Sequence, residues 1–125
     1  MKNTKVLHLT LHRRYFDQIA SGIKKEEYRT LKPYWKKRLT NPAFHNCDHY
    51  EYAYFDIDQE VFRQDYTHIK FKNGYSANSP KMLVELTGIY FGEGKKEWGA
   101  KSNEIYFILS LGRILKLENY GRAAA

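Results

Sequence analysis

Hydrophobic and polar residues alternate along much of the chain, and this period of two is typical of β-strands with one buried face. In the first such stretch, residues 6–12, three leucines alternate with His8, Thr10 and His12. The same reasoning predicts further strands at residues 24–31, 49–55, 66–72, 81–90, 103–111 and 113–117. We expect the last two to be bent or broken at Gly112, which gives about six strands in all.

Two segments follow a helical period instead. Residues 13–21 carry apolar side chains four positions apart, and Gly22 follows where a helix end favours glycine. Pro33 is well placed to open a second short helix over residues 34–39. Because both helices fall early and strands dominate afterwards, we predict an α+β, mainly β fold. A small, mostly antiparallel barrel of about six strands, with the two short helices near one opening, fits this order best.

The composition agrees with a single globular domain and adds a hint about partners. A length of 125 residues favours one domain, which we place at residues 1–122, because the three alanines at 123–125 resemble a vector-derived tail. Eleven Tyr, seven Phe and two Trp favour strands and supply flat faces that can stack on bases. A formal charge of +7 favours polyanionic partners such as nucleic acid, although it also simply keeps a small protein in solution.

The single cysteine, Cys47, excludes an internal disulfide and suits a reducing compartment. The N-terminal residues run directly into the alternating pattern without a long apolar block. We therefore expect neither a signal peptide nor a membrane span, and we predict a cytoplasmic location.

Charged residues concentrate where the first helix gives way to the second strand. Residues 22–29 read Gly-x-Lys-x-x-Glu-x-Arg. On a strand, Glu27 and Arg29 share one face and can form an ion pair, while Lys24 beside the helix end can hold an anion. Two interpretations stay open. The pair stabilises the rim of the fold, or Lys24 and Arg29 contact a phosphate or base while Glu27 orients them.

The four positions Gly22, Lys24, Glu27 and Arg29 resemble the defining motif of the ASCH domain family, a branch of the PUA-like β-barrel superfamily. The resemblance to small phage and bacterial ASCH proteins covers nearly the whole chain. It includes the opening strand before a short helix, Lys-Pro-Tyr-Trp at residues 32–35, Asn-Gly-Tyr at 73–75 and the glycine-containing loop at 92–100.

The resemblance implies a cleft beside the motif that binds RNA or a nucleotide-like ligand. Some relatives are hydrolases, including small amidohydrolases that act on acylated cytidine nucleosides. Those enzymes carry a threonine nucleophile at the position of Glu27 and an activating lysine at the position of Lys24. Because glutamate does not replace a hydroxyl nucleophile, we expect a binding module and not an enzyme. The alternative is a small hydrolase acting on RNA or a modified nucleoside, with Lys24, Glu27 and Glu85 in acid–base roles.

Glu85 is a candidate because it lies among apolar neighbours on the most apolar strand. A buried carboxylate needs a partner, and Lys24 or Arg29 could supply one across the barrel. The other interpretation is that Glu85 faces solvent.

Two aromatic and basic segments supply further candidate contacts for a ligand. Tyr34 and Trp35 lie among basic residues of the second helix, a mixture that suits phosphate and base contact. A solvated helix face over a buried Trp35 is the simpler interpretation. Lys95 and Trp98 lie in a glycine-rich loop that could cover the cleft, with Trp98 stacking on the ligand. In the alternative interpretation, Trp98 fills the core.

The histidines and the cysteine do not form a convincing metal site. His8 and His12 would lie about 13 Å apart on a strand, too far to share an ion. His45, Cys47 and His49 lack a fourth ligand and the paired spacing of structural zinc sites. We therefore expect no metal and no other cofactor. A third functional option is a protein-interaction surface on the tyrosine-rich strand at residues 50–54, if it is exposed.

Overall fold

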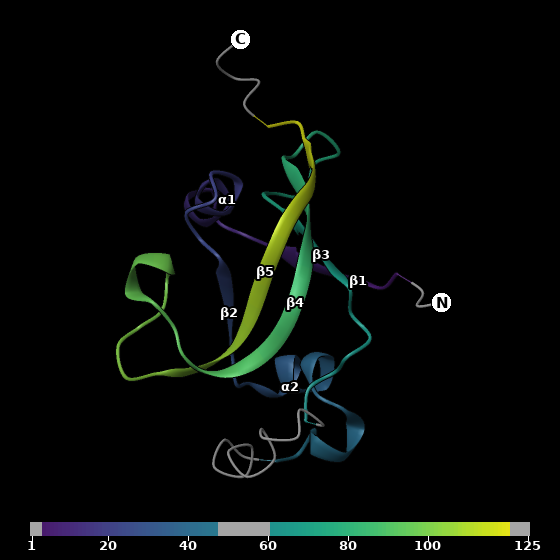
Figure 1. Ribbon diagram of the computed structural model, residues 1–125, viewed down its shortest axis with the longest axis vertical. Helices are drawn as coiled ribbons and strands as arrows, with labels where there is room; N and C mark the ends of the chain where they lie inside the picture. Colours follow the sequence, from purple (N-terminus) through teal and green to yellow (C-terminus); the bar gives the residue numbers. More distant parts are fainter. Residues whose placement is uncertain (1–3, 48–60, 121–125) are drawn as a thin grey trace. The chain divides into compact units, whose positions relative to one another are not determined.

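The computed structural model describes residues 4–47 and 61–120. These residues form five strands, two α-helices and two short 3₁₀ turns (Figure 1). In chain order the elements are β1 (Val6–Thr10), α1 (Arg13–Ala20), β2 (Glu26–Thr30), α2 (Pro33–Leu39), η1 (Pro42–Phe44), β3 (His68–Lys72), β4 (Lys81–Glu93), η3 (Lys96–Trp98) and β5 (Ile105–Glu118). Neither α-helix in the described ranges is long and apolar enough to cross a membrane.

The strands form one mixed sheet in the order β1-β3-β4-β5-β2. β1 pairs with β3 in parallel, whereas β3 pairs with β4 and β2 pairs with β5 in antiparallel fashion. In this order β1 and β2 are the two end strands, and no pairing joins them within the described ranges. The mainly β, α+β prediction is therefore confirmed, but the described residues form a curled five-stranded sheet that does not close into the predicted barrel of about six strands.

Two of the strand predictions need comment. We expected a bend or a break at Gly112, and the break is absent because β5 continues through it as one strand. A Cβ at Gly112 would lie 2.9 Å from Thr87 Cγ2 and 3.1 Å from the Glu85 side chain, so glycine here allows close approach to β4. The predicted strand at residues 49–55, with its tyrosines, lies outside the described residues.

The chain groups into two compact units, which share the long strands β4 and β5. The first unit comprises Met1–Lys25, Asp65–Thr87 and Leu111–Ala125. The second comprises Glu26–Gln64 and Gly88–Ser110.

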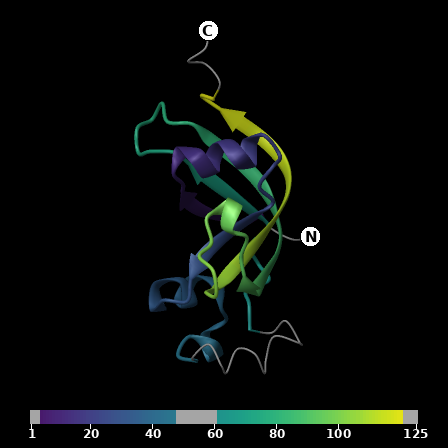
Figure 2. The ribbon, with the colours of Figure 1, turned by 90° about the vertical axis from the view of Figure 1, so that its left-hand side faces the viewer.

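The first unit has its core between α1 and the strands β1, β3 and β4. Leu7, Leu9 and Leu11 are buried, as the alternation of the opening stretch predicted, and α1 contributes Phe16 and Ile19. Figure 2 shows α1 running across one face of these strands. The sheet also contributes Ile69, Phe71, Met82, Val84 and Leu111.

The second unit buries apolar residues from α2 and β5 and from the segment that precedes β3. Phe62 and Phe107 meet edge to face with ring centroids 6.2 Å apart, and both are fully buried. A β-bridge between Thr40 and Phe62 holds that segment beside the end of α2. Pro33 occupies the first turn of α2, as predicted.

Candidate functional site

The junction after α1 is fixed by backbone hydrogen bonds in the first unit. Gly22 takes φ +85°, in the left-handed region, and its N–H donates to the Ile19 carbonyl at 3.0 Å. The N–H groups of Ile23 and Lys24 both donate to the Gln18 carbonyl, each at 3.0 Å. The bonds from Gly22 and Ile23 form a Schellman motif, the usual glycine-dependent helix end. The sequence prediction for Gly22 is thus confirmed, and the backbone up to Lys24 is held to the helix.

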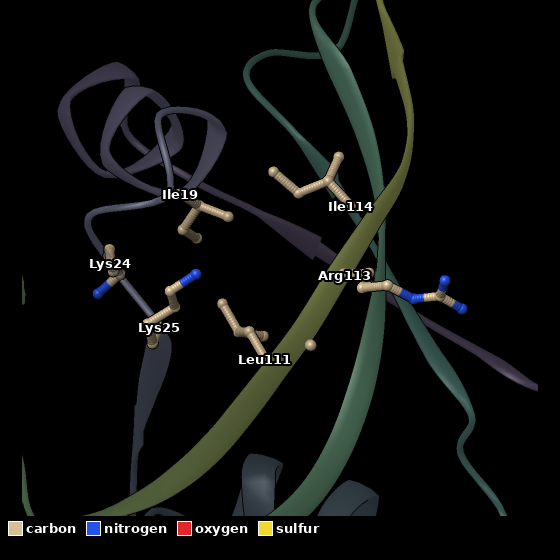
Figure 3. Close-up of a pocket in the computed structure, with 8 residues that line it drawn as sticks. Ile19, Lys24, Lys25, Leu111, Arg113 and Ile114 are labelled. Carbon is tan, nitrogen blue, oxygen red and sulfur yellow. The ribbon is translucent and has the colours of Figure 1, made fainter.

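Two adjacent lysines leave this junction in different directions. Lys24 is 1% exposed, and its Nζ lies over the Tyr15 ring, 5.0 Å from the centroid. Lys25 is exposed, and its side chain is directed toward the space between Ile19 and Leu111, whereas that of Lys24 turns the other way (Figure 3). The Lys25 carbonyl accepts a hydrogen bond from the Leu111 N–H at 3.0 Å, which ties the junction to β5.

A pocket of about 330 Å³ lies between the junction and β5. Ile19, Leu111 and Ile114 supply apolar walls, and Figure 3 shows the Arg113 guanidinium directed away from it. The Lys25 ammonium is therefore the cationic group that faces this space. Such a pocket can hold a flat or apolar group against the walls while the ammonium attracts an anion. Its full lining is Ile19, Gly22, Lys24, Lys25, Leu111, Gly112, Arg113 and Ile114.

The remaining motif residues belong to β2 in the second unit. Arg29 Nη2 lies 2.9 Å from Glu27 Oε2, and the two side chains are only 18% and 9% exposed. A charged pair this far from water interacts more strongly than a surface pair. The ion pair expected from their spacing is therefore present, and its burial favours a structural role.

Arg29 also begins a series of aromatic contacts. Its guanidinium lies 5.0 Å from the centroid of the Trp35 ring, and Trp35 meets Tyr34 edge to face at 4.7 Å. The Arg38 guanidinium lies 3.6 Å from the centroid of the Tyr34 ring. Tyr34 is 55% exposed, whereas Trp35 is half-buried. The structure thus joins Glu27, Arg29, Trp35 and Tyr34 in one series of contacts and adds Arg38 at its exposed end.

Tyr28 of β2 forms a hydrogen bond to the glycine-containing loop at residues 92–100. The Tyr28 hydroxyl accepts a hydrogen bond from the Lys95 N–H at 2.9 Å and donates one to Glu26 Oε1 at 2.8 Å. Burial raises the pKa of the Tyr28 hydroxyl well above its usual range, and Glu26 adds to the increase. The Lys95 ammonium lies 4.4 Å from the centroid of the Trp98 ring. Lys95 and Trp98 therefore form a cation–π pair, with Trp98 half-buried.

Glu85 lies on β4 in the first unit and has a partner that no sequence pattern suggested. Its Oε1 accepts hydrogen bonds from the Arg113 backbone N–H at 3.0 Å and from Arg113 Nε at 3.2 Å. The hydrogen bonds from Arg113 hold the pKa of the Glu85 carboxyl below its usual range. Glu85 is half-buried at the point where β5 passes Gly112.

Sequence reasoning missed Lys25, Arg113 and Tyr28. Lys25 stands inside the motif segment, but only its environment distinguishes it from Lys24. Arg113 and Tyr28 act through neighbours that are distant in sequence, Glu85 and Lys95. In the described ranges, no group of three or more histidines, cysteines or carboxylates is arranged to hold a metal ion.

Comparisons with known proteins identify no relative: no protein-family model, curated protein or solved structure matches the chain.

Proposed function

We propose that this protein is a binding module of the ASCH type that holds RNA or a nucleotide-like ligand beside the Gly22–Arg29 motif. The observation that carries the proposal is the pocket at the junction, where the Lys25 ammonium faces apolar walls. A nucleotide combines a flat, weakly polar base with an anionic phosphate. The walls formed by Ile19, Leu111 and Ile114 suit the base, and the ammonium suits the phosphate.

The junction is well suited to this role because its backbone is already ordered. The Gln18 carbonyl and the left-handed Gly22 hold the chain as far as Lys24, and the Lys25 carbonyl bonds to β5. A ligand that enters such a pocket orders few additional groups, so little of its binding energy is lost to entropy.

The second unit offers a separate basic and aromatic surface for the same class of ligand. Tyr34 is exposed, and Arg38 covers one side of its ring while Trp35 meets it edge to face. Guanidinium groups beside aromatic rings favour stacking of bases and contact with phosphates. The net charge of +7 adds a general attraction for polyanions.

Binding of the four nucleoside 5′-monophosphates tests the pocket. We expect wild-type protein to bind at least one of them and Lys25→Gln to weaken that binding about tenfold, because a charge-assisted hydrogen bond contributes about 1.5–3 kcal/mol. Arg14→Gln is the matched control, since Arg14 is an exposed cation of α1 that does not line the pocket. Equal affinity of wild type and Lys25→Gln would contradict the proposed site.

The hydrolase alternative is separated from binding by Glu27→Gln. A binding module shows no turnover of RNA or acylated nucleosides in the wild-type protein. A hydrolase that uses Glu27 shows turnover in wild type that is lost in Glu27→Gln while the substrate still binds. In the structure Glu27 and Glu85 are each paired with an arginine, contacts that also occur in proteins without catalysis.

A further inference from the structure

The first unit presents a row of lysines on the side of its sheet that faces away from the core. In β3 the buried Ile69 and Phe71 alternate with Lys70 and Lys72, and the register places Lys72 directly opposite Lys81 of β4. We call this surface the lysine face, and it comprises Lys70, Lys72 and Lys81 together with Lys116 and Glu118 of β5.

Glu118 confirms that these residues share one surface. Its carboxylate lies 3.4 Å from Lys116 Nζ and 3.7 Å from Lys70 Nζ. Its pKa is lowered by the hydrogen bond from Lys116 and by the charges of Lys116, Lys70 and Lys81. The Glu118 carboxylate therefore interacts with three of the four lysines, and the four lysines and one glutamate give the lysine face an excess of three positive charges.

The charge arrangement is unfavourable for the isolated protein. Lys72 and Lys81 are directly opposed across an antiparallel pair, and like charges in that position destabilise a sheet. The Lys81 ammonium donates to the Ala77 carbonyl at 3.1 Å, a contact that does not neutralise its charge. An anion bound on this face would reduce the repulsion between the lysines. Binding of an anion should therefore also stabilise the folded protein.

An exposed aromatic ring lies beside these charges. Tyr75 follows β3, is 84% exposed, and has the Lys72 ammonium 5.8 Å from its ring centroid. Proteins bind single-stranded nucleic acids with two kinds of group: cations contact the phosphates, and exposed aromatic rings stack on the bases. The lysine face has both. Lysine ammonium groups bind phosphates as point charges, without the bidentate geometry of arginine, so such contacts carry little sequence specificity.

We propose that the lysine face binds the phosphate backbone of single-stranded nucleic acid, with Tyr75 stacking on a base. This surface goes beyond the pocket at Lys25, and the inference does not rest on nucleotide binding there. Lys70 and Lys72 lie on one face of β3, beside Lys81 of β4 and Lys116 of β5. Together they can contact several phosphates of a single-stranded nucleic acid, without sequence specificity.

The salt dependence of binding a fluorescent single-stranded oligouridylate tests the proposal. Each phosphate contact to a single strand contributes about −0.7 to the slope of log affinity against log salt. The double variant Lys72→Gln/Lys81→Gln should therefore have a slope about 1.4 shallower than wild type. When the salt concentration rises fourfold, the factor by which affinity falls should be about sevenfold smaller for the variant than for wild type. Because the substitutions relieve a like-charge pair, the variant should melt no earlier than wild type.

The matched control, Arg14→Gln/Lys101→Gln, removes the same charge from exposed positions outside the lysine face. It should leave the slope unchanged. If wild type and the lysine-face variant share one slope, or if the control becomes shallower by the same amount, the proposal is overturned. Competition by polyglutamate as effective as by oligouridylate would overturn the nucleic-acid assignment in favour of acidic proteins.

Tyr75→Ala tests the stacking contribution separately. Loss of one base-stacking contact should weaken oligouridylate binding about tenfold without changing the salt slope. The ring is exposed, so its removal leaves the core intact. Unchanged affinity would remove Tyr75 from the site. Lys25→Gln, measured with nucleoside monophosphates, reports on the pocket alone and so separates a failure there from a failure here.

Discussion

Replacement of Gly22 by alanine tests the junction on which the pocket depends. Gly22 has φ +85°, and a Cβ added there would meet no atom within 4 Å. The cost is therefore backbone strain alone, about 1–2 kcal/mol for an L-residue in the left-handed region. Alanine also restricts the unfolded chain, which offsets about 0.4–1 kcal/mol. We expect Gly22→Ala to lower the free energy of unfolding by about 1 kcal/mol.

Urea denaturation measures this change, and Gly92→Ala is the matched control. Gly92 lies in β4 without a positive φ, and its added Cβ would make an ordinary contact of 3.5 Å with Ile108 Cδ1. That variant should gain about 0.5 kcal/mol. With a slope of about 2 kcal/mol per molar urea, Gly22→Ala should unfold about 0.5 M earlier than wild type at unchanged slope.

The opposite result is informative because no clash can explain it. If Gly22→Ala is as stable as wild type, or gains stability as Gly92→Ala does, then Gly22 does not hold a left-handed conformation in solution. The Schellman motif that orders Ile23 and Lys24 would then be absent. Gly22→Asn should lie between wild type and alanine, because asparagine tolerates this region better than other side chains.

Two further predictions concern the second unit. Arg29→Met should lower the free energy of unfolding by about 3 kcal/mol, because it leaves the buried Glu27 carboxylate without the guanidinium. Glu27→Gln should lower it by only about 1 kcal/mol. Equal losses of the two variants in urea denaturation would contradict this reasoning. Burial raises the pKa of Tyr28, so the folded state retains that proton after the unfolded chain releases it, and stability should fall as the pH rises above about 10. Tyr28→Phe should show a shallower loss across that range in the same assay, and an unchanged pH profile would argue against a raised pKa.

The local elements could be predicted because their signals lie within a few residues. Alternation in residues 6–12 was sufficient to predict which leucines of β1 are buried, and Gly22 and Pro33 marked helix boundaries correctly. These signals report on the near environment of each backbone segment, which a short window of sequence contains.

The predicted barrel of about six strands was only partly correct, because strand order depends on contacts distant in the chain. β1 pairs in parallel with β3, and no alternation pattern specifies that partner. Gly112 shows the same difficulty at one position. A glycine within a strand pattern indicates a break or a close approach, and only the nearby Thr87 and Glu85 decide for close approach.

The candidate site was predicted in part for the same reason. The spacing of Glu27 and Arg29 predicted their ion pair, but the Arg113 partner of Glu85 and the contact between Tyr28 and Lys95 join distant segments. The lysine face could not be predicted either, because its residues come from three strands and only the strand register brings them together.

Affinity of the wild-type protein for a labelled single-stranded RNA, measured across a series of salt concentrations, tests the central claim most directly. Contacts from the four lysines of the lysine face predict a straight decline of log affinity against log salt with a slope of about −3. Additional contacts at Lys25 would make it steeper. A flat response, or no binding at the lowest salt, would contradict the proposal that this protein binds nucleic acid.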